Sequence, residues 1–425
     1  MITRIEANNY RCFERLGVTV GAFCVLAGAN GSGKTTLLDI PILIGDALKS
    51  RNVAAAFLER VLDRGARASS LLDLPFRGIR ESFVLAVEAQ LPEAIQKRLV
   101  DASSPAVQRA KDRWPTHVRY EFRLAIDDAH QLEVKNEYLF VFPHSAAYEA
   151  GRLPMQGENL DQDGWRFILR REYGADAAFR PETHGAKERS THLDSTLLAF
   201  ARLQFEAEAE FGAGRWLLDW LQNEVVFFDP KWVDLRRASP PGLPRQLMPS
   251  GQNLPWLALH LQKEKPERFA AWVEHVRTAL PQIASIEAKE REEDHHAYFR
   301  VGYEGGFEVT SSGLSEGTLR ILALTLVAYL QDAPKLLIVE EPENSIHPQA
   351  IETVMQSLCS LYDSQVWVST HSPIVLADRK LAELITTRLE RSGTVTVTPG
   401  PEHPRLAEWK GAIDLGSLFA TGVFE

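Results

Sequence analysis

The chain has 425 residues, of which 45% are hydrophobic and 24% charged, so it is long enough for two or three structural units. Asp and Glu outnumber Lys and Arg by 57 to 47, and the net charge of −10 argues against a generally basic nucleic-acid binder. The three cysteines stand far apart, which argues against a disulfide framework or a zinc site: Cys12, Cys24 and Cys359. The N-terminal residues carry no apolar signal segment, and no uncharged apolar run reaches the roughly 20 residues that span a bilayer. We therefore expect a soluble cytoplasmic protein without membrane contacts.

The N-terminal residues predict two strands, a glycine-rich loop and a helix. Residues 2–7 alternate between apolar and polar side chains, and two asparagines mark a turn after them. Phe23–Ala27 is a short apolar run that ends at glycines, which is the pattern of a buried strand. Residues 35–48 are apolar at the spacing of a helix.

A hairpin is predicted further along the first lobe. Ser82–Gln90 alternates like a strand. Residues 118–126 and 131–141 also alternate, and the four residues between them, Asp-Asp-Ala-His, are a turn signal. We expect these strands to share an N-terminal lobe with the glycine loop, over residues 1–142.

The next segment, residues 143–225, has a weaker pattern. Residues 143–190 carry many Gly, Pro and charged side chains with little periodicity. Residues 192–225 are helical in pattern. We therefore expect an irregular and helical insertion.

The C-terminal part alternates between helices and strands. Two helices broken near Pro266 are followed by two strands, and from Leu314 the pattern is helix, strand, helix, strand, helix. Strands that alternate with helices form a parallel sheet covered on both faces. The predicted fold class is α/β, a mixed and parallel sheet with flanking helices plus the insertion. The remaining expected boundaries are a C-terminal lobe over residues 226–400 and a tail over residues 401–425.

The segment after the second strand fits the phosphate-binding pattern G-x-x-x-x-G-K-[ST]. The residues expected to bind the nucleotide are Gly28, Ala29, Asn30, Gly31, Ser32, Gly33, Lys34, Thr35 and Thr36. Glycines let backbone N–H groups turn toward phosphates, and the helix that follows points its positive end at them. Lys34 would reach the β- and γ-phosphates of ATP, and the Thr35 hydroxyl would ligate Mg²⁺. A chance glycine turn is a poor alternative, since a strand precedes the loop and a helix follows it.

A second motif is an apolar strand that ends in two acids, Lys-Leu-Leu-Ile-Val-Glu-Glu-Pro, the Walker B pattern. A buried strand delivers such carboxylates to the edge of the sheet where ligands bind. We assign Glu340 to Mg²⁺, directly or through water, and Glu341 to the attacking water. A strand end with two solvated acids would look the same, but the phosphate loop in the same chain favours the functional interpretation.

Two further features lie near the Walker B strand in sequence. Ser315 is a good N-cap for the apolar helix that follows, and Gly317 allows close backbone approach. An ordinary capped helix has the same composition, but this one lies between the phosphate loop and Walker B. His371 follows the next strand, where it would reach the γ-phosphate and the water near Glu341; a lone histidine is otherwise usually structural.

These motifs in this order resemble the ABC-type P-loop ATPases of the RecF and SMC-like group. Residues 314–318, Leu-Ser-Glu-Gly-Thr, are similar to the ABC signature, whose usual form is LSGGQ or LSGGE. Residues 343–347 sit at the family's D-loop and His371 at its switch histidine. A more specific resemblance is to small bacterial AAA family ATPases akin to the ATPase domain of the OLD family, which read L-S-E-G-T-L-R, E-E-P-E-N-x-I-H-P and S-T-H-S-P.

The resemblance implies an ABC-type ATPase head that hydrolyses ATP, with Glu341, His371 and Lys34 as catalytic residues. In this family the signature of one subunit closes on the ATP held by the other subunit. Ser315 and Gly317 would therefore complete the nucleotide site of a partner copy in a homodimer. Residues 5–13 are similar to the family's N-terminal N-F-R-S-F segment, by which Arg11 would lie near the nucleotide.

The sequence departs from the family pattern in several places. Glu340 stands where most ABC proteins have Asp, which favours metal contact through water. No Q-loop glutamine is identified, and there is no SMC-type coiled coil. The residues after Leu376 are too few for the TOPRIM nuclease of the OLD family, so we expect none here. The likeness covers residues 1–48 and 226–378.

Two sets of residues have the look of metal sites. Asp127 with Glu133 and Lys135 resembles a D…E-x-K nuclease centre, although matches this short are common. The segment Glu-Glu-Asp-His-His at residues 292–296 contains metal-ligating types, but adjacent histidines on a charged loop are more often solvated.

Two functions stay open at the level of sequence. The first is a dimeric, ATP-hydrolysing switch that gates a separate effector, such as a nuclease encoded nearby, in prokaryotic defence against phage or foreign DNA, as the resemblance implies. The second is a DNA-binding clamp for repair or recombination, as in RecF. The clamp needs a basic surface, and a cluster of arginines after the phosphate-loop helix could supply it: Arg51, Arg60, Arg64, Arg67, Arg77 and Arg80. The alternative is that these are ordinary surface arginines exposed to solvent. A non-hydrolysing scaffold is disfavoured while Lys34, Glu341 and His371 are all present.

Overall fold

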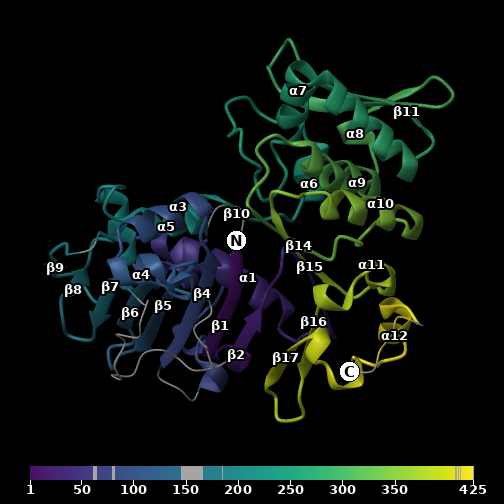
Figure 1. The fold of residues 1–425 in the computed structure, drawn as a ribbon. Coiled ribbons are helices and arrows are strands. Elements are labelled where there is room, and N and C mark those ends of the chain that lie inside the picture. Colours follow the sequence, from purple (N-terminus) through teal and green to yellow (C-terminus); the bar gives the residue numbers. More distant parts are fainter. Residues whose placement is uncertain are drawn as a thin grey trace. The chain divides into compact units, whose positions relative to one another are not determined.

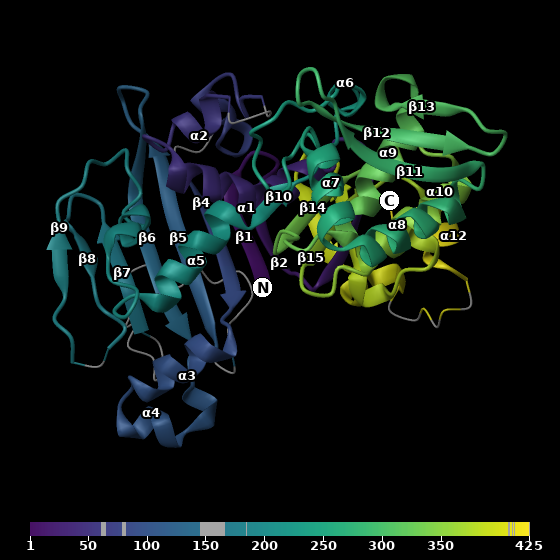
Figure 2. The same ribbon diagram turned by 90° about the horizontal axis from the view of Figure 1, so that it is seen from above.

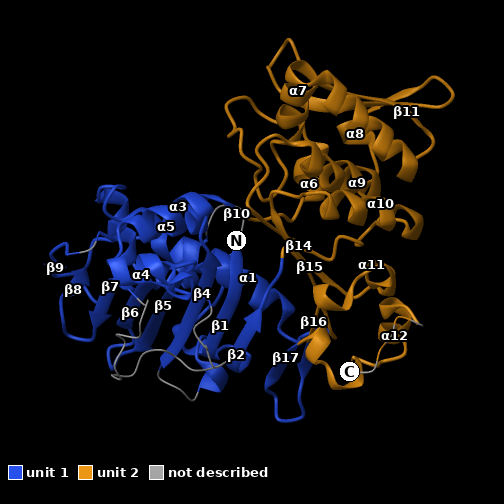
Figure 3. Ribbon diagram, in the orientation of Figure 1, with its two compact units in different colours: residues 1–21, 30–225, 387–398 blue, residues 22–29, 226–386, 399–425 orange. Residues whose placement is uncertain are grey.

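The computed structural model describes residues 1–60, 65–78, 82–144, 166–183, 185–406, 409, 411 and 413–424. The chain divides into two compact units, each made of separate stretches of sequence (Figures 1 and 3). Unit 1 comprises Met1–Gly21, Asn30–Val225 and Thr387–Thr398, and unit 2 comprises Ala22–Ala29, Val226–Thr386 and Pro399–Glu425. The strand that precedes the phosphate loop thus belongs to unit 2, and the helix that follows it belongs to unit 1.

Unit 1 is built on an eight-stranded sheet in the order β2-β1-β4-β5-β6-β7-β8-β9, in which every pair of neighbours is antiparallel. The strands are β1 (Ile2–Tyr10), β2 (Phe13–Thr19), β4 (Ser82–Gln90), β5 (His117–Ile126), β6 (Leu132–Phe142), β7 (Arg166–Glu172), β8 (Ala177–Phe179) and β9 (Arg189–Thr191). The predicted hairpin is confirmed as β5 and β6. Strand β2 was not predicted, because its two charged residues, Glu14 and Arg15, are adjacent and interrupt the alternation.

Helices α1 (Lys34–Lys49) and α5 (Gly212–Asn223) lie across one face of this sheet (Figure 2). They cross closely at Gly45, where an added β-carbon would lie 2.2 Å from the carbonyl oxygen of Leu221. A glycine is therefore required at this crossing. The other helices of unit 1 are α2 (Ala55–Leu58), α3 (Glu93–Asp101) and α4 (Pro105–Arg109).

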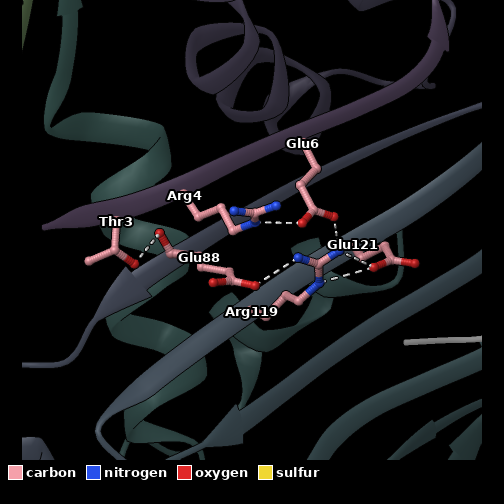
Figure 4. Close-up of polar contacts among 6 residues, drawn as sticks. All are labelled: Thr3, Arg4, Glu6, Glu88, Arg119 and Glu121. Atoms are coloured by element: carbon pink, nitrogen blue, oxygen red, sulfur yellow. Dashed lines mark hydrogen bonds and ion pairs between the residues drawn. The ribbon is translucent and has the colours of Figure 1, made fainter. Parts of the chain in front are cut away.

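A charged cluster is buried within strands β1, β4 and β5 (Figure 4). Arg119 is fully buried and pairs with Glu6 at 2.7 Å, Glu88 at 2.8 Å and Glu121 at 2.6 Å. Arg4 adds a second cation, 2.6 Å from Glu6. Strand register brings these residues together, because Arg4, Glu88 and Arg119 stand opposite one another on adjacent strands. Buried charges are tolerated only when they are paired in this way.

The structure differs from the prediction of an irregular insertion over residues 143–190. Residues 145–165 and 184 lie outside the described part of the chain, but β7, β8 and β9 continue the sheet of unit 1. Arg171 shows why the pattern was missed: it is buried, and its guanidinium donates hydrogen bonds to the carbonyl oxygens of Leu193, Asp194 and Leu197. A buried arginine looks like a surface residue in a sequence. The helical pattern over residues 192–225 yields α5 and the 3₁₀ segment Phe200–Phe205.

Unit 2 contains a sheet in the order β10-β14-β15-β3-β16, in which β14, β15, β3 and β16 are parallel. The strands are β10 (Val225–Phe227), β14 (Leu336–Glu340), β15 (Gln365–Thr370), β3 (Phe23–Ala27) and β16 (Leu384–Leu389). β16 starts in unit 2 and ends in unit 1, and the next strand, β17 (Val395–Pro399), pairs with it at the end of the sheet. All six residues of β15 are buried, as parallel strands covered on both faces require.

The remaining elements of unit 2 cover this sheet and form one apolar core. The helices are α6 (Trp232–Arg236), α7 (Leu254–Glu264), α8 (Pro266–Ala279), α9 (Glu316–Leu326), α10 (Pro348–Cys359), α11 (Pro373–Ala377) and α12 (Leu415–Ala420). A small antiparallel sheet consists of β11 (Ile283–Glu290), β12 (Ala297–Tyr303) and β13 (Glu308–Thr310). The core joins Val25 of β3, Val339 of β14 and Val368 of β15 with Trp272 of α8, which is fully buried. The predicted break at Pro266 is confirmed, because α8 starts there.

Candidate nucleotide site

Three strands of unit 2 end at the same edge of the parallel sheet. Glu340, the last residue of β14, pairs with Ser369 of β15, and Thr370 at the end of β15 pairs with Ala27 at the end of β3. The residues that follow these strands are Glu341, His371 and Gly28. The carboxyl edge of a parallel sheet is where ligands bind in open α/β folds. Unit 2 therefore brings together the start of the phosphate loop, the Walker B acids and the predicted switch histidine.

The phosphate loop continues from Gly28 and Ala29 into unit 1, where α1 begins at Lys34. Gly31 and Gly33 have positive φ angles of 75° and 85°, a conformation that favours glycine. An added β-carbon on Gly33 would lie 2.9 Å from the Cys12 sulfur, so the site also lacks room for a side chain. The Ser32 hydroxyl is buried, 2.6 Å from the Thr387 hydroxyl. A glycine turn held at the start of a 16-residue helix suits a phosphate group.

The segment of Arg11 and Cys12 lies beside this turn in unit 1. Burial raises the pKa of the Cys12 thiol, and a hydrogen bond with the Thr36 side chain partly offsets that rise. Arg11 has a positive φ angle of 49° and donates a hydrogen bond to the Arg67 carbonyl oxygen. Thus Cys12 contacts the phosphate loop, whereas the guanidinium of Arg11 donates to the backbone of Arg67. The role of Arg11 at the nucleotide stays a prediction.

Glu341 is held by contacts on several sides. Its backbone has a positive φ angle of 43°, which is uncommon outside glycine, and its N–H donates to the Ser369 carbonyl oxygen at 2.9 Å. One carboxylate oxygen lies 3.3 Å from Nε2 of His371, and the other accepts a hydrogen bond from Asn344 at 2.6 Å. The side chain is partly exposed. The residue predicted to act on water is therefore fixed and accessible.

The signature segment is joined to the Walker B turn within the same unit. Ser315 caps α9, accepting a hydrogen bond from the Thr318 N–H at 3.2 Å. An added β-carbon on Gly317 would lie 2.4 Å from the carbonyl oxygen of Ser345, which follows the Walker B acids. Ser345 donates to the Glu316 carboxylate at 3.1 Å. The glycine is required by this close approach.

Arg320 makes a second link between α9 and the end of β14. It is largely buried, and it donates hydrogen bonds to the carbonyl oxygens of Glu340 at 3.3 Å and Glu341 at 3.0 Å. Burial lowers the pKa of Arg320, and the nearby acids Asp229, Glu316, Glu343 and Glu341 offset part of that effect. A movement of the signature helix would therefore act on the Walker B turn directly.

One residue of the site was not assigned a role from sequence. Glu343 accepts hydrogen bonds from the Thr370 hydroxyl at 2.5 Å and from the His371 N–H at 3.0 Å. It was placed only at the family's D-loop, because its partners lie on another strand. The signal that points to it is the third acid of Glu-Glu-Pro-Glu, directly after the Walker B pair.

The side chains of the two candidate metal sites make hydrogen bonds and ion pairs with other residues of the chain. Asp127 accepts a hydrogen bond from the Gln131 N–H in the hairpin turn, and Glu133 pairs with Lys135 at 2.7 Å. His295 pairs with Glu290 and His296 with Asp294, on an exposed turn. Among the described residues, no group of three or more His, Cys, Asp or Glu side chains is arranged to hold a metal ion.

The arginines proposed for a DNA surface are partly neutralised by acids. Arg67 pairs with Asp39 at 2.6 Å and with Asp46 at 2.7 Å, both on α1. Arg51 pairs with Glu59. Arg77 donates a hydrogen bond to the Ser392 carbonyl oxygen, and Arg60 is exposed. Arg64 and Arg80 lie outside the described residues. Within the described part of the chain, this cluster has less free positive charge than its composition suggests.

Comparisons with known sequences agree with the motifs. Residues 232–377 match the family model described as "AAA domain, putative AbiEii toxin, Type IV TA system". The Old nuclease of Escherichia phage P2 is 33% identical over 96 residues, which cover 20% of this chain and 16% of that protein. The OLD nuclease of Thermus scotoductus is 30% identical over 80 residues, or 18% of this chain and 15% of that protein. The chain thus matches less than a fifth of the length of these relatives.

Comparison with solved structures identifies the fold. An Smc head bound to the C-winged helix domain of ScpA aligns with a TM-score of 0.52 at 15% identity, covering 93% of this chain and 96% of that chain. An Smc head with an extended coiled coil, bound to the C-terminal domain of ScpA from Pyrococcus furiosus, aligns with a TM-score of 0.50 at 13% identity, covering 93% and 95%. No helix among the described residues is long and apolar enough to cross a membrane. The chain thus has the fold of an SMC head, and its AAA domain match and partial OLD matches make it similar to the ABC-type AAA ATPases related to the OLD family.

Proposed function

We propose that this chain binds ATP with Mg²⁺ and hydrolyses it to ADP and phosphate. The observation that carries this proposal is the register of β14, β15 and β3, which places Glu341, His371 and Gly28 after three neighbouring strand ends. The AAA domain match and the SMC-head fold support a general ATPase function. The acids and the histidine support hydrolysis in addition to binding.

Binding rests on the phosphate loop. Backbone N–H groups of such a glycine loop and the N-terminus of α1 would attract the phosphates, and Lys34 adds a positive charge at the start of that helix. The left-handed Gly31 and Gly33 let the backbone take this course. Thr35 and Glu340 are the residues that would hold Mg²⁺, which lowers the charge repulsion between the phosphates and an attacking oxygen.

Hydrolysis requires a water molecule to attack the γ-phosphorus while the bond to the β–γ bridging oxygen breaks. Glu341 orients this water and accepts its proton, because its carboxylate is partly exposed at the sheet edge. His371 and Asn344 each hold one oxygen of that carboxylate, which reduces its freedom before the reaction. The ADP formed keeps the bridging oxygen, and the phosphate leaves with the oxygen of water.

The nucleotide is further proposed to join two copies of the chain. Ser315 and Glu316 are exposed at the start of α9, and Gly317 after them is partly exposed. An exposed N-terminus of an 11-residue helix suits the γ-phosphate of ATP bound to a partner copy. Arg320 and Gly317 link this signature to the turn of Glu341. Closure of the dimer would thus affect the position of the Glu341 carboxylate.

For the biological role, we propose a switch that gates a separate effector, such as a nuclease, in defence against phage or foreign DNA. The support is the partial match to OLD nucleases together with a chain dominated by the ATPase fold. The two Smc heads are bound to domains of another protein, which supports a partner chain here. A gene for a TOPRIM-like or HNH-like nuclease beside the gene for this chain would agree with this role.

The second candidate is a RecF-like clamp on DNA. It would bind plain duplex DNA by itself, with an affinity that falls steeply with salt. The ion pairs of Arg51 and Arg67 favour the switch over the clamp. Gel-shift titrations at two salt concentrations separate the two roles, because the switch needs its partner chain before it binds DNA.

The test of the enzymatic proposal is ATP hydrolysis by the purified chain, with Glu341→Gln and Lys34→Ala beside it. We expect the wild-type chain to release phosphate, Glu341→Gln to bind ATP but lose activity by about 100-fold or more, and Lys34→Ala to lose ATP binding. Glu352→Gln, an exposed acid on α10, serves as the control and should keep full activity. Absence of phosphate release by the wild-type chain, or equal activity in Glu341→Gln, contradicts the proposal.

A further inference from the structure

The turn after β15 is organised by one carboxylate on another segment. Glu343 accepts two hydrogen bonds at one of its oxygens, from the Thr370 hydroxyl and from the His371 N–H. Thr370 in turn accepts a hydrogen bond from the Ser372 N–H at 2.9 Å. Glu343 therefore fixes the backbone on both sides of the His371 side chain.

The other oxygen of Glu343 is buried and has no hydrogen-bond partner among the described residues. Such an oxygen costs about 1–3 kcal/mol, more for a charged group. A residue with a single hydroxyl would avoid this cost, because it has no second polar atom to leave without a partner. The residue is therefore poorly chosen for stability alone, which points to a role in the site beside it.

His371 depends on this turn for its position. Its Nε2 reaches the Glu341 carboxylate only if the backbone after Thr370 keeps its course, since β15 ends there. Glu341 and Glu343 lie on the same short turn, so the carboxylate and the histidine share one support. A displacement of about 1 Å at such a contact can reduce a rate by as much as 10²-fold.

We propose that Glu343 is a positioning residue that docks the Walker B turn onto the His371 turn and so sets the His371–Glu341 contact. This rests on the proposed ATP hydrolysis. Glu343 would join the residues that support hydrolysis, and through it a movement of the Walker B turn would reach His371. Because Arg320 of the signature helix also holds this turn, the same route extends to α9.

The first test separates binding from catalysis. Glu343→Ala should lower kcat by about 10- to 100-fold and leave KM for ATP within about twofold. Glu343→Gln keeps an oxygen that accepts both hydrogen bonds, so it should recover most of the lost rate. Glu352→Ala, which changes an exposed acid on α10 that accepts a hydrogen bond from Gln356, should match the wild type. Full activity of Glu343→Ala overturns the proposal.

A double-mutant cycle with His371→Ala shows whether Glu343 acts through the histidine. Once His371 is removed, Glu343→Ala should lower kcat by less than about threefold, because the residue then has no imidazole to place. If the two substitutions multiply their effects on kcat, Glu343 acts by another route and the proposal fails.

Amide hydrogen exchange tests the same claim without any activity. Glu343→Ala should raise the exchange rate of the His371 and Ser372 N–H groups by about tenfold or more, while peptides of α10 keep their rates. Unchanged exchange at this turn overturns the proposal. This readout stands even if the chain fails to hydrolyse ATP, so failure of the proposed function and failure of this inference give different results.

Discussion

Nε2 of His371 lies 3.3 Å from a carboxylate oxygen of Glu341, although the two residues come from different strands. Parallel pairing of β14 with β15 ends both strands at one edge and so creates this contact. Asn344 donates to the other oxygen of the same carboxylate at 2.6 Å. His371 and Asn344 thus hold Glu341 from two sides, and we expect each of them to contribute to catalysis.

Asn344→Ala should lower kcat for ATP hydrolysis by about tenfold and leave ATP affinity unchanged. The substitution frees one oxygen of Glu341 without removing the carboxylate. Steady-state kinetics and binding of a non-hydrolysable ATP analogue measure the two effects. Gln356→Ala, which removes an exposed side-chain amide from α10, is the control. A tenfold loss of ATP affinity in Asn344→Ala would place this residue in binding instead.

Gly317→Ala should disturb the signature and the Walker B turn together. The added β-carbon would lie 2.4 Å from the Ser345 carbonyl oxygen, so the backbone must shift at a cost of about 1–3 kcal/mol. We expect a lower unfolding temperature and a loss of most ATPase activity. Gly65→Ala is the matched control, because its β-carbon would meet nothing within 4 Å. Equal stability of the two variants would show that the approach of Ser345 is not tight.

Arg119→Met should destabilise the chain strongly. It leaves the buried carboxylates of Glu6, Glu88 and Glu121 without their shared cation, a loss of about 3–5 kcal/mol for a broken buried pair. Thermal and urea unfolding measure it. Arg170→Met, which breaks an exposed pair with Glu172 on the same sheet, should change stability by at most about 1 kcal/mol. Similar losses in both variants would contradict this account.

His117 makes stability depend on pH. Burial lowers the pKa of His117 to about 4, and the neighbouring His144 and the N-terminal amine add to that shift. The unfolded chain therefore takes up a proton first, near pH 6.5, and the folded chain does so only near pH 4. Stability contributed by neutral His117 is complete above pH 6.5 and is lost as pH falls toward 4, by up to about 3 kcal/mol.

Urea midpoints at pH 7, 5.5 and 4.5 test the effect of His117. His117→Phe should lose less stability across this range than the wild type, because it removes the group that protonates on unfolding. His192→Gln is the control, since the His192 side chain is 90% exposed. Parallel pH curves for the wild type and His117→Phe would contradict the shift.

Much of the fold follows from the sequence. The apolar runs predicted β3 and the buried part of β14, and the strand-like pattern of Ser82–Gln90 predicted β4. Proline at position 266 separated α7 from α8. These features have strong local patterns. By contrast, β7–β9 were missed because they are short or carry the buried Arg171, and β2 because the adjacent Glu14 and Arg15 interrupt its alternation.

The candidate site likewise has parts that the sequence predicts and parts that it does not. The phosphate loop, the Walker B strand and the signature are contiguous motifs, so the sequence predicts them directly. Glu343 holds its partners on the segment after β15, and only the register of β14 with β15 reveals those contacts, whereas Asn344 contacts Glu341 within their own turn. The close approach of Gly317 to Ser345 is likewise a tertiary contact that no local pattern encodes.

In the proposed mechanism, ATP at the phosphate loop joins two copies of the chain, and hydrolysis by Glu341 ends this state. The most direct measurement is the molar mass of Glu341→Gln by light scattering, with and without ATP and Mg²⁺. We expect one chain without nucleotide and a stable dimer with it, and no dimer when Lys34→Ala is added. A Glu341→Gln variant that binds ATP yet keeps the mass of a single chain would contradict the account.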